Sequence, residues 1–221
     1  MKKIIMSVII AIGLLVPQII QAQGTITYLS SLSPTSTGIH SVGSDSWLAA
    51  GFETGNNIGG YELNSIQLGM AGVSGNPSGF TVMIYAQSDN PNAILPGSSS
   101  LATLDGSADP STAGIYTYTD DSNLILSPTT LYFIVLTAGT TVANGAYSWN
   151  DSAFPPDSSG GLGDNNAVFY SNNGISGWNV TPYLGIAQFT ISSTAVPEPS
   201  PSLLLLLGVG VFIYVRRTFH R

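Results

Sequence analysis

The sequence predicts an all-β protein with a single β-sandwich ectodomain of jelly-roll type, and a barrel is the second choice. Three observations lead to this prediction. Apolar residues in the middle of the chain recur with a period of two, the apolar runs are short, and Gly, Pro and Asn separate them at intervals of about ten residues. Addressing segments are expected on either side of this domain: an N-terminal signal peptide and a C-terminal transmembrane sorting helix.

Five stretches have the composition of strands. In Phe80 to Gln87, the apolar residues Phe80, Val82, Ile84 and Ala86 alternate with Thr81, Met83, Tyr85 and Gln87, which predicts a half-buried strand. Leu131 to Leu136 is continuously apolar, which predicts a central strand covered on both faces. The remaining expected strands contain Ile66, Leu68 and Met70 on one face, Ile115 to Thr119, and Tyr183 to Ile191.

Two Asn-Gly pairs are the sharpest turn signals. Type I′ hairpin turns need positive φ at both central positions, which Gly permits and Asn tolerates. Asn144-Gly145 and Asn173-Gly174 therefore place Ala146 to Trp149 and Val168 to Ile175 in hairpin regions.

Residues 1–22 have the order of a secretory signal peptide. Lys2 and Lys3 precede the apolar stretch Ile4 to Val16, and the small residue Ala22 follows. Cleavage is expected between Ala22 and Gln23, and an uncleaved N-terminal anchor is the alternative. The ectodomain then covers residues 23–193.

The C-terminal region divides into three parts. Residues 194–202 form a Pro-rich linker, 203–215 an apolar transmembrane segment, and 216–221 a basic cytoplasmic tail. Thirteen residues at about 1.5 Å each cover roughly 20 Å of the ~30 Å hydrocarbon core, which favours transient or processed insertion over a permanent anchor. A buried C-terminal helix of a globular domain is the alternative.

Charge is segregated along the chain. All five Lys and Arg residues lie in 1–3 and 216–221, and all twelve carboxylates lie between them. A domain without Lys or Arg cannot neutralise phosphates, so the composition excludes nucleic-acid binding. Cysteine is absent, so no disulfide supports the exported domain.

The C-terminal tail resembles the PEP-CTERM tail of bacterial surface proteins. The resemblance rests on Pro197-Glu198-Pro199, the following apolar segment, and the arginine cluster with Arg216 and Arg217. It implies an exosortase-type sorting enzyme and the secretion machinery as partners. It also implies contact with the membrane through the C-terminal helix, and an inner-membrane precursor that reaches the cell surface or a polysaccharide-containing extracellular matrix.

The ectodomain resembles the choice-of-anchor R domain. The resemblance is carried by Leu63 to Leu68, Phe80 to Pro91, Gly114 to Tyr118 and Leu126 to Leu136. Members of that family share an exported β-rich domain joined to varying C-terminal sorting signals. No catalytic residues are established for the family, so the resemblance implies no site residue here.

The residue types argue against an enzyme. The ectodomain has one histidine, His40, which is expected to be a surface or hydrogen-bonded loop residue. It has no cysteine and no Gly-x-Ser-x-Gly elbow. A glycoside-active enzyme that uses two carboxylates, with Glu53 and Glu62 as candidates, is the third hypothesis.

Calcium is the candidate metal, and no other cofactor is expected. Asp105 with Asp109, and Asp157 with Asp164, are pairs of loop carboxylates of the kind that hard cations prefer. Solvated acidic loops are the alternative interpretation.

Three tryptophans lie beside polar or glycine-rich residues. Trp149 and Trp178 are the candidate ligand-binding residues, because a ring in a polar setting can stack on a sugar. Core packing is the alternative. The resemblance of the tail implies a structural or adhesive surface protein, and the alternative is a carbohydrate-binding module that uses these tryptophans.

Overall fold

The computed structural model describes residues 26–32, 35–90, 94–106, 108–153, 157–159, 162–163, 169–172, 177–180 and 185–197. The chain divides into two compact units, and every strand lies in the unit Thr25–Val196. The described residues contain strands and no helix, which confirms the all-β prediction. The expected signal peptide, transmembrane segment and basic tail lie outside the described residues.

The strands are β1 (Ile26–Ser30), β2 (Ile39–Val42), β3 (Trp47–Thr54), β4 (Tyr61–Gly75), β5 (Thr81–Gln87), β6 (Pro96–Gly106), β7 (Ala113–Thr119), β8 (Ile125–Leu126), β9 (Leu131–Thr137), β10 (Gly145–Ser152), β11 (Asp157–Ser159), β12 (Leu162–Gly163), β13 (Phe169–Asn172), β14 (Asn179–Val180), β15 (Ile186–Ala187) and β16 (Phe189–Ala195).

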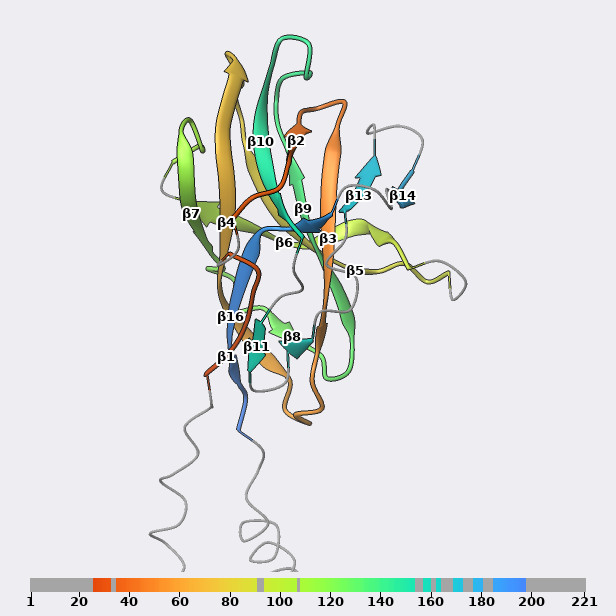
Figure 1. Ribbon diagram of the computed structural model, residues 1–221. Coiled ribbons are helices and arrows are strands. Elements are labelled where there is room, and N and C mark those ends of the chain that lie inside the picture. Colours follow the sequence, from red (N-terminus) through yellow and green to blue (C-terminus); the bar gives the residue numbers. More distant parts are fainter. Residues whose placement is uncertain are drawn as a thin grey trace, which may run out of the picture. The chain divides into compact units, whose positions relative to one another are not determined.

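These strands form a curled antiparallel sheet with the order β11-β1-β16-β4-β7-β6-β5-β9-β3-β13-β14. Strand β6 joins its two halves, because it pairs with β5 from Pro96 to Leu104 and with β7 at Asp105 and Gly106. Figure 1 shows β7, β4 and β16 on the left and β3 and β13 on the right. Strand β10 pairs with β4, β2 and β15 outside this path.

One main core lies inside the curl. Leu68 of β4 and Phe189 of β16 meet Phe52 of β3, Ile84 of β5 and Ile134 of β9 in a single buried cluster. Period-two alternation explains the β4 contribution, because alternate side chains of a strand point to the same face. The expected shared face is confirmed for these core residues: Ile66, Leu68 and Met70.

The two central strands show how far apolar patterning predicts burial. Strand β9 is buried at every position from Tyr132 to Leu136, which confirms the prediction of cover on both faces. Strand β5 exists where it was expected, but the half-buried prediction is wrong. Met83 and Tyr85, on the face opposite Val82 and Ile84, are also buried.

The prediction of a hairpin at Asn144-Gly145 is wrong. Strand β10 pairs with β4 and β2 and not with β9, the strand before it in the chain. The turn is instead closed by the N–H groups of Asn144 and Gly145, which donate to the Thr141 carbonyl at 2.9 and 3.1 Å. Asn173-Gly174 lies outside the described residues.

The last expected strand is divided in its described part and extends further toward the C-terminus. Gln188 separates β15 from β16, and its N–H donates to the Asn150 carbonyl at 2.9 Å. Strand β16 then continues to Ala195, because Thr194 pairs with Glu62 and Ala195 with Tyr61. Two residues of the expected linker at 194–202 therefore belong to the sheet.

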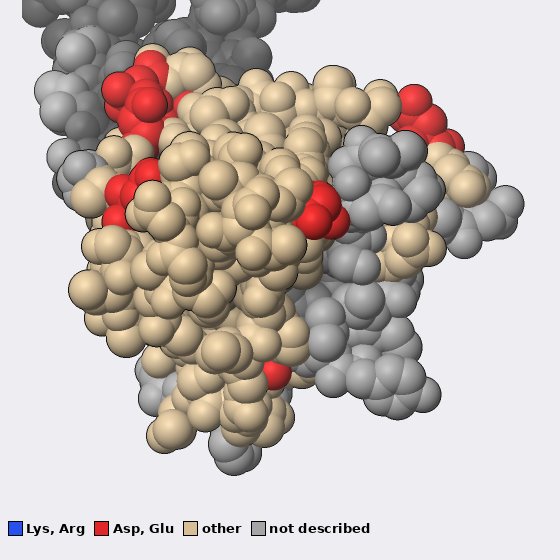
Figure 2. All heavy atoms as spheres, turned by 90° about the horizontal axis from the view of Figure 1, so that it is seen from above, with Lys and Arg blue, Asp and Glu red and all other residues tan. Residues whose placement is uncertain are grey.

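Carboxylates are dispersed over the surface of the domain. Figure 2 shows separate acidic patches on a largely uncharged face, and no Lys or Arg among the described atoms of that view. The sequence has no Lys or Arg between Lys3 and Arg216. Ion pairs with Lys or Arg therefore do not stabilise this domain, and apolar burial and hydrogen bonds do so.

Candidate functional site

Trp149, expected to stack on a sugar, is a core residue. It lies in β10 opposite Met70 of β4 and His40 of β2, and its side chain is completely buried. Its indole N–H donates a hydrogen bond to the Gln188 carbonyl at 2.8 Å. Because neither face of the ring reaches solvent, the prediction of sugar stacking by Trp149 is wrong.

Trp178 lies beside a second apolar cluster, on the face of β3, β9 and β5 that points away from the main core. Trp178 and Trp47 are half-buried against it, as are Leu95 and Leu131. The indole N–H of Trp47 donates to the Ser44 carbonyl at 3.1 Å. We call Trp47, Trp178 and this cluster the tryptophan face; the cluster consists of Ala49, Met83, Tyr85, Phe133 and Val135.

The tryptophan face combines aromatic rings with few polar groups. Burial raises the pKa of Tyr85, whose hydroxyl lies 4.0 Å from the Met83 sulfur. The exposed Asn179 follows Trp178 directly and begins β14. A half-exposed ring beside an amide can stack on an apolar sugar face and bond its hydroxyls. Of the two tryptophans predicted as binding residues, Trp178 alone lies where it could do this.

A different surface covers the outer side of β1, β16, β4 and β7. Register aligns Ser30, Thr190, Gln67 and Thr117 in one row across these strands. Ser30 and Thr190 share a hydrogen bond of 2.6 Å, and the Gln67 amide donates to Thr117 at 3.3 Å. The next row contains Ser192, Ser65 and Thr119. We call these two rows the hydroxyl face.

Asp105 and Asp109, one of the two predicted calcium pairs, lie at the end of β6 and in the loop after it. The Asp109 carboxylate accepts a hydrogen bond from the Tyr147 hydroxyl at 2.8 Å. Burial and the neighbouring Asp109 raise the pKa values of Tyr118 and Tyr147. The Tyr118 hydroxyl is buried and has no hydrogen-bond partner in the described part of the chain.

The second predicted calcium pair is only half described. Asp157 is exposed in β11 and pairs with Ser30 of β1, whereas Asp164 lies outside the described residues. Within the described ranges no three His, Cys, Asp or Glu side chains come together in a group that could hold a metal ion.

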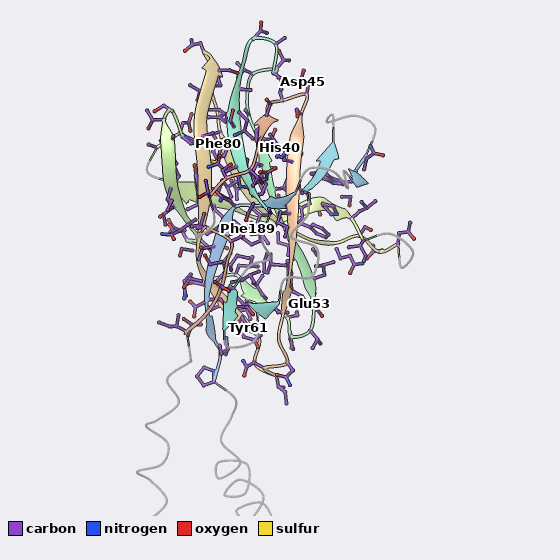
Figure 3. The ribbon with its side chains drawn as sticks, viewed as in Figure 1. His40, Asp45, Glu53, Tyr61, Phe80 and Phe189 are labelled. Atoms are coloured by element: carbon purple, nitrogen blue, oxygen red, sulfur yellow. The ribbon has the colours of Figure 1, made fainter. Side chains whose placement is uncertain are left out.

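His40 makes a contact that the sequence analysis missed. It lies in β2, not in a loop, and its Nε2 is 3.0 Å from a carboxylate oxygen of Asp151 in β10. The other oxygen of Asp151 accepts a hydrogen bond from the Thr37 hydroxyl at 2.8 Å. Both side chains of the pair are largely buried, and Figure 3 shows His40 among the strands of the upper half of the domain.

Two glycines leave room for the Asp151 carboxylate. A Cβ at Gly38 would lie 2.7 Å from it, and one at Gly185, where φ is +74°, would lie 3.0 Å from it. No local signal predicts this pair, because His40 and Asp151 are 111 residues apart in the sequence. The pair joins β2 to β10 and supplies the domain with one internal acid–base contact.

The two glutamates considered for glycoside chemistry lie in different strands. Glu53 of β3 pairs with Leu131 of β9, and Glu62 of β4 pairs with Thr194 of β16 and Ile125 of β8. Both side chains are partly buried.

Most residues of the predicted addressing signals lie outside the described part of the chain. These are Ala22 and Gln23 at the expected cleavage site, and Glu198, Pro199, Arg216 and Arg217 of the sorting signal. Pro197 is the last described residue. Among the described residues we find no helix that is both long enough and apolar enough to cross a bilayer.

No family model matches this chain, and no curated protein matches it either.

Proposed function

We propose that this chain is an exported, non-catalytic protein of the cell surface or extracellular matrix, with a structural or adhesive role. Its β domain is a jelly-roll-like sandwich displayed from a PEP-CTERM-type C-terminal sorting tail. The main core, which contains side chains from both halves of the curled sheet, supports the sandwich. The tail resemblance supports the route, through an exosortase-type enzyme and the secretion machinery.

One observation supports the proposal that the domain is displayed from the C-terminal tail: the first and last described strands of the domain are neighbours. Strand β1 pairs antiparallel with β16, and Ile26 lies opposite Thr194. The chain therefore enters β1 and leaves β16 at one end of the domain. The segment that follows β16 is therefore attached at this end of the domain.

The route is tested by changing the sorting signal. Glu198→Gln alters the Pro-Glu-Pro triad without adding charge or bulk, and Glu53→Gln in β3 is the matched control within the domain. We expect the Glu198→Gln protein to accumulate in the inner-membrane fraction, and the control to reach the cell surface or medium. Equal distribution of the two variants would contradict a role of the triad in sorting.

Carbohydrate binding is the second candidate function, and the tryptophan face favours it. The side chains of Trp47 and Trp178 are half-buried on this face. The domain has no Lys or Arg that could make the surface around them cationic. A neutral or weakly charged glycan is the ligand chemistry that fits. Saturable binding of such a glycan that Trp178→Ala abolishes, with unchanged circular dichroism, would establish this activity.

A further inference from the structure

Exposed isoleucines mark the end of the domain where β1 begins and β16 ends. Ile26, Ile58 and Ile125 are 69%, 77% and 48% exposed. Strand register places two of them in one row, because Ile26 pairs with Thr194, Thr194 with Glu62, and Glu62 with Ile125. We call Ile26, Ile58 and Ile125 the isoleucine end.

Hydrogen bonds hold Ile58 at the same end. It lies in the turn between Asn57 and Gly60, where the Asn57 amide donates to the carbonyls of Gly60 at 2.6 Å and Val196 at 2.9 Å. The Val196 N–H donates back to the Gly60 carbonyl at 2.9 Å. A Cβ at Gly60 would lie 3.1 Å from Cγ2 of Ile125. The exposed isoleucines therefore lie at the same end of the domain as Val196.

Chain length limits how far this end can lie from the apolar segment. Leu203 follows Val196 by seven residues, which span at most about 25 Å even when fully extended. The limit holds for every arrangement of the two parts. Figure 3 labels Tyr61, the first residue of β4, near this end and Asp45 at the opposite end.

We propose that the isoleucine end contacts the lipid–water interface of the bilayer that receives Leu203 to Val215. The inference rests on the proposed membrane insertion of that segment. Removal of isoleucine side chains from water is favourable, and exposed apolar residues that share one end of a domain can mark an interaction surface. Because the domain has no Lys or Arg, the contact is apolar and the favoured surface is neutral phospholipid.

Glu62 sets the depth of this contact. It lies in the same row as Ile26 and Ile125, and a carboxylate is costly to place in hydrocarbon. The domain therefore rests at the level of the lipid headgroups and does not enter the bilayer core.

The absence of cysteine permits a clean fluorescence test on the full chain. Asn56→Cys places an environment-sensitive fluorophore beside Ile58. Ser74→Cys places the same fluorophore near the far end of β4, roughly 40 Å from the first residue of that strand at about 3.3 Å per residue. In phosphatidylcholine vesicles we expect a blue shift and brightening at position 56, and a water-like spectrum at position 74.

Two triple variants of the Asn56→Cys chain identify the cause. The combined changes Ile26→Ser, Ile58→Ser and Ile125→Ser should abolish the blue shift. The control changes Ile39→Ser, Ile94→Ser and Ile115→Ser, at side chains that are 59%, 46% and 61% exposed, should leave it unchanged. A blue shift that survives loss of the isoleucine end would overturn the proposal.

Flotation of the same vesicles separates the inference from the proposed function. A chain that floats while its fluorophore at position 56 stays water-like overturns the lipid contact and leaves membrane insertion intact. A chain that does not float overturns both. A blue shift without vesicles would assign the isoleucine end to a second copy of this chain, and would also overturn the lipid contact.

Discussion

The two outer faces of the curled sheet differ, although the strands beneath them share one core. The hydroxyl face presents rows of Ser, Thr and Gln side chains on β1, β16, β4 and β7. The tryptophan face covers β3, β9 and β5 with Met, Tyr, Phe and Val, most of it buried. The sequences of the strands reflect this difference. Burial alternates along Phe189 to Ala195, whereas Leu131 to Leu136 is continuously apolar. A continuously apolar strand thus indicates the half of the sheet that is covered on both faces.

The largest expected effect is a difference in stability between the two faces. Phe133→Ala should reduce the free energy of unfolding by about 3–5 kcal/mol, because its ring is completely buried in the tryptophan face. Thr117→Ala on the hydroxyl face should change it by less than about 0.5 kcal/mol. Urea denaturation followed by tryptophan fluorescence measures both, and similar losses would contradict the assignment of the faces.

Alkaline pH should destabilise the domain through Tyr118, which lies on the core side of β7. Burial, then the charge of Asp109, raises its pKa above the ordinary value of 10.0. The unfolded chain therefore releases this proton first, and stability falls by up to about 1.4 kcal/mol per pH unit above about pH 10.

Tyr118→Phe isolates this effect. The variant should lose part of the alkaline dependence and be at least as stable at neutral pH, because the buried hydroxyl has no partner among the described residues. Thermal unfolding between pH 8 and pH 11 provides the measurement. An unchanged alkaline slope would show that other tyrosines dominate it.

Trp178→Ala should have a smaller effect on stability than Phe133→Ala. Its ring is half-buried, so the expected loss is about 1–2 kcal/mol in the free energy of unfolding. Isothermal titration with neutral polysaccharide fragments then tests whether the same change removes binding. Binding that persists in this variant would separate the tryptophan face from any glycan.

A small pH-dependent effect is expected for Asp120, directly after β7. Desolvation raises its pKa, but hydrogen bonds from Ser122 and Leu124 outweigh that effect and hold the pKa below its ordinary value. This contribution is present above about pH 4 and is lost as pH falls through the lowered pKa. Asp120→Ala should cost less than about 1 kcal/mol at pH 7, and the difference from wild type should shrink at pH 2.

Local sequence patterns predicted where the strands lie better than they predicted which faces are buried and which strands pair. The continuous apolar run of β9 was sufficient to predict cover on both of its faces. The alternating pattern of β5 wrongly predicted a half-buried strand. Met83 has an adaptable side chain and Tyr85 an amphipathic one, and both are buried. Asn144-Gly145 misled as well, since β10 finds its partners in β4 and β2, remote in the sequence.

Predicting the candidate site required long-range information that the sequence patterns lack. Trp149 and Trp178 have similar polar neighbours in the sequence, yet one is a core residue and the other lies on the outer cluster. Asp151 follows Trp149 by two residues, and it is buried against His40 of β2. Pairing between strands decides both outcomes, and a single sequence does not encode it locally.

The intact mass of the native protein, measured separately in membrane and extracellular fractions, tests the central claim most directly. The account predicts a species that begins near Gln23 and ends near Pro197 to Ser200, found outside the membrane fraction or carrying added mass there. A species that retains Arg221 and stays in the membrane fraction would contradict sorting through the C-terminal tail.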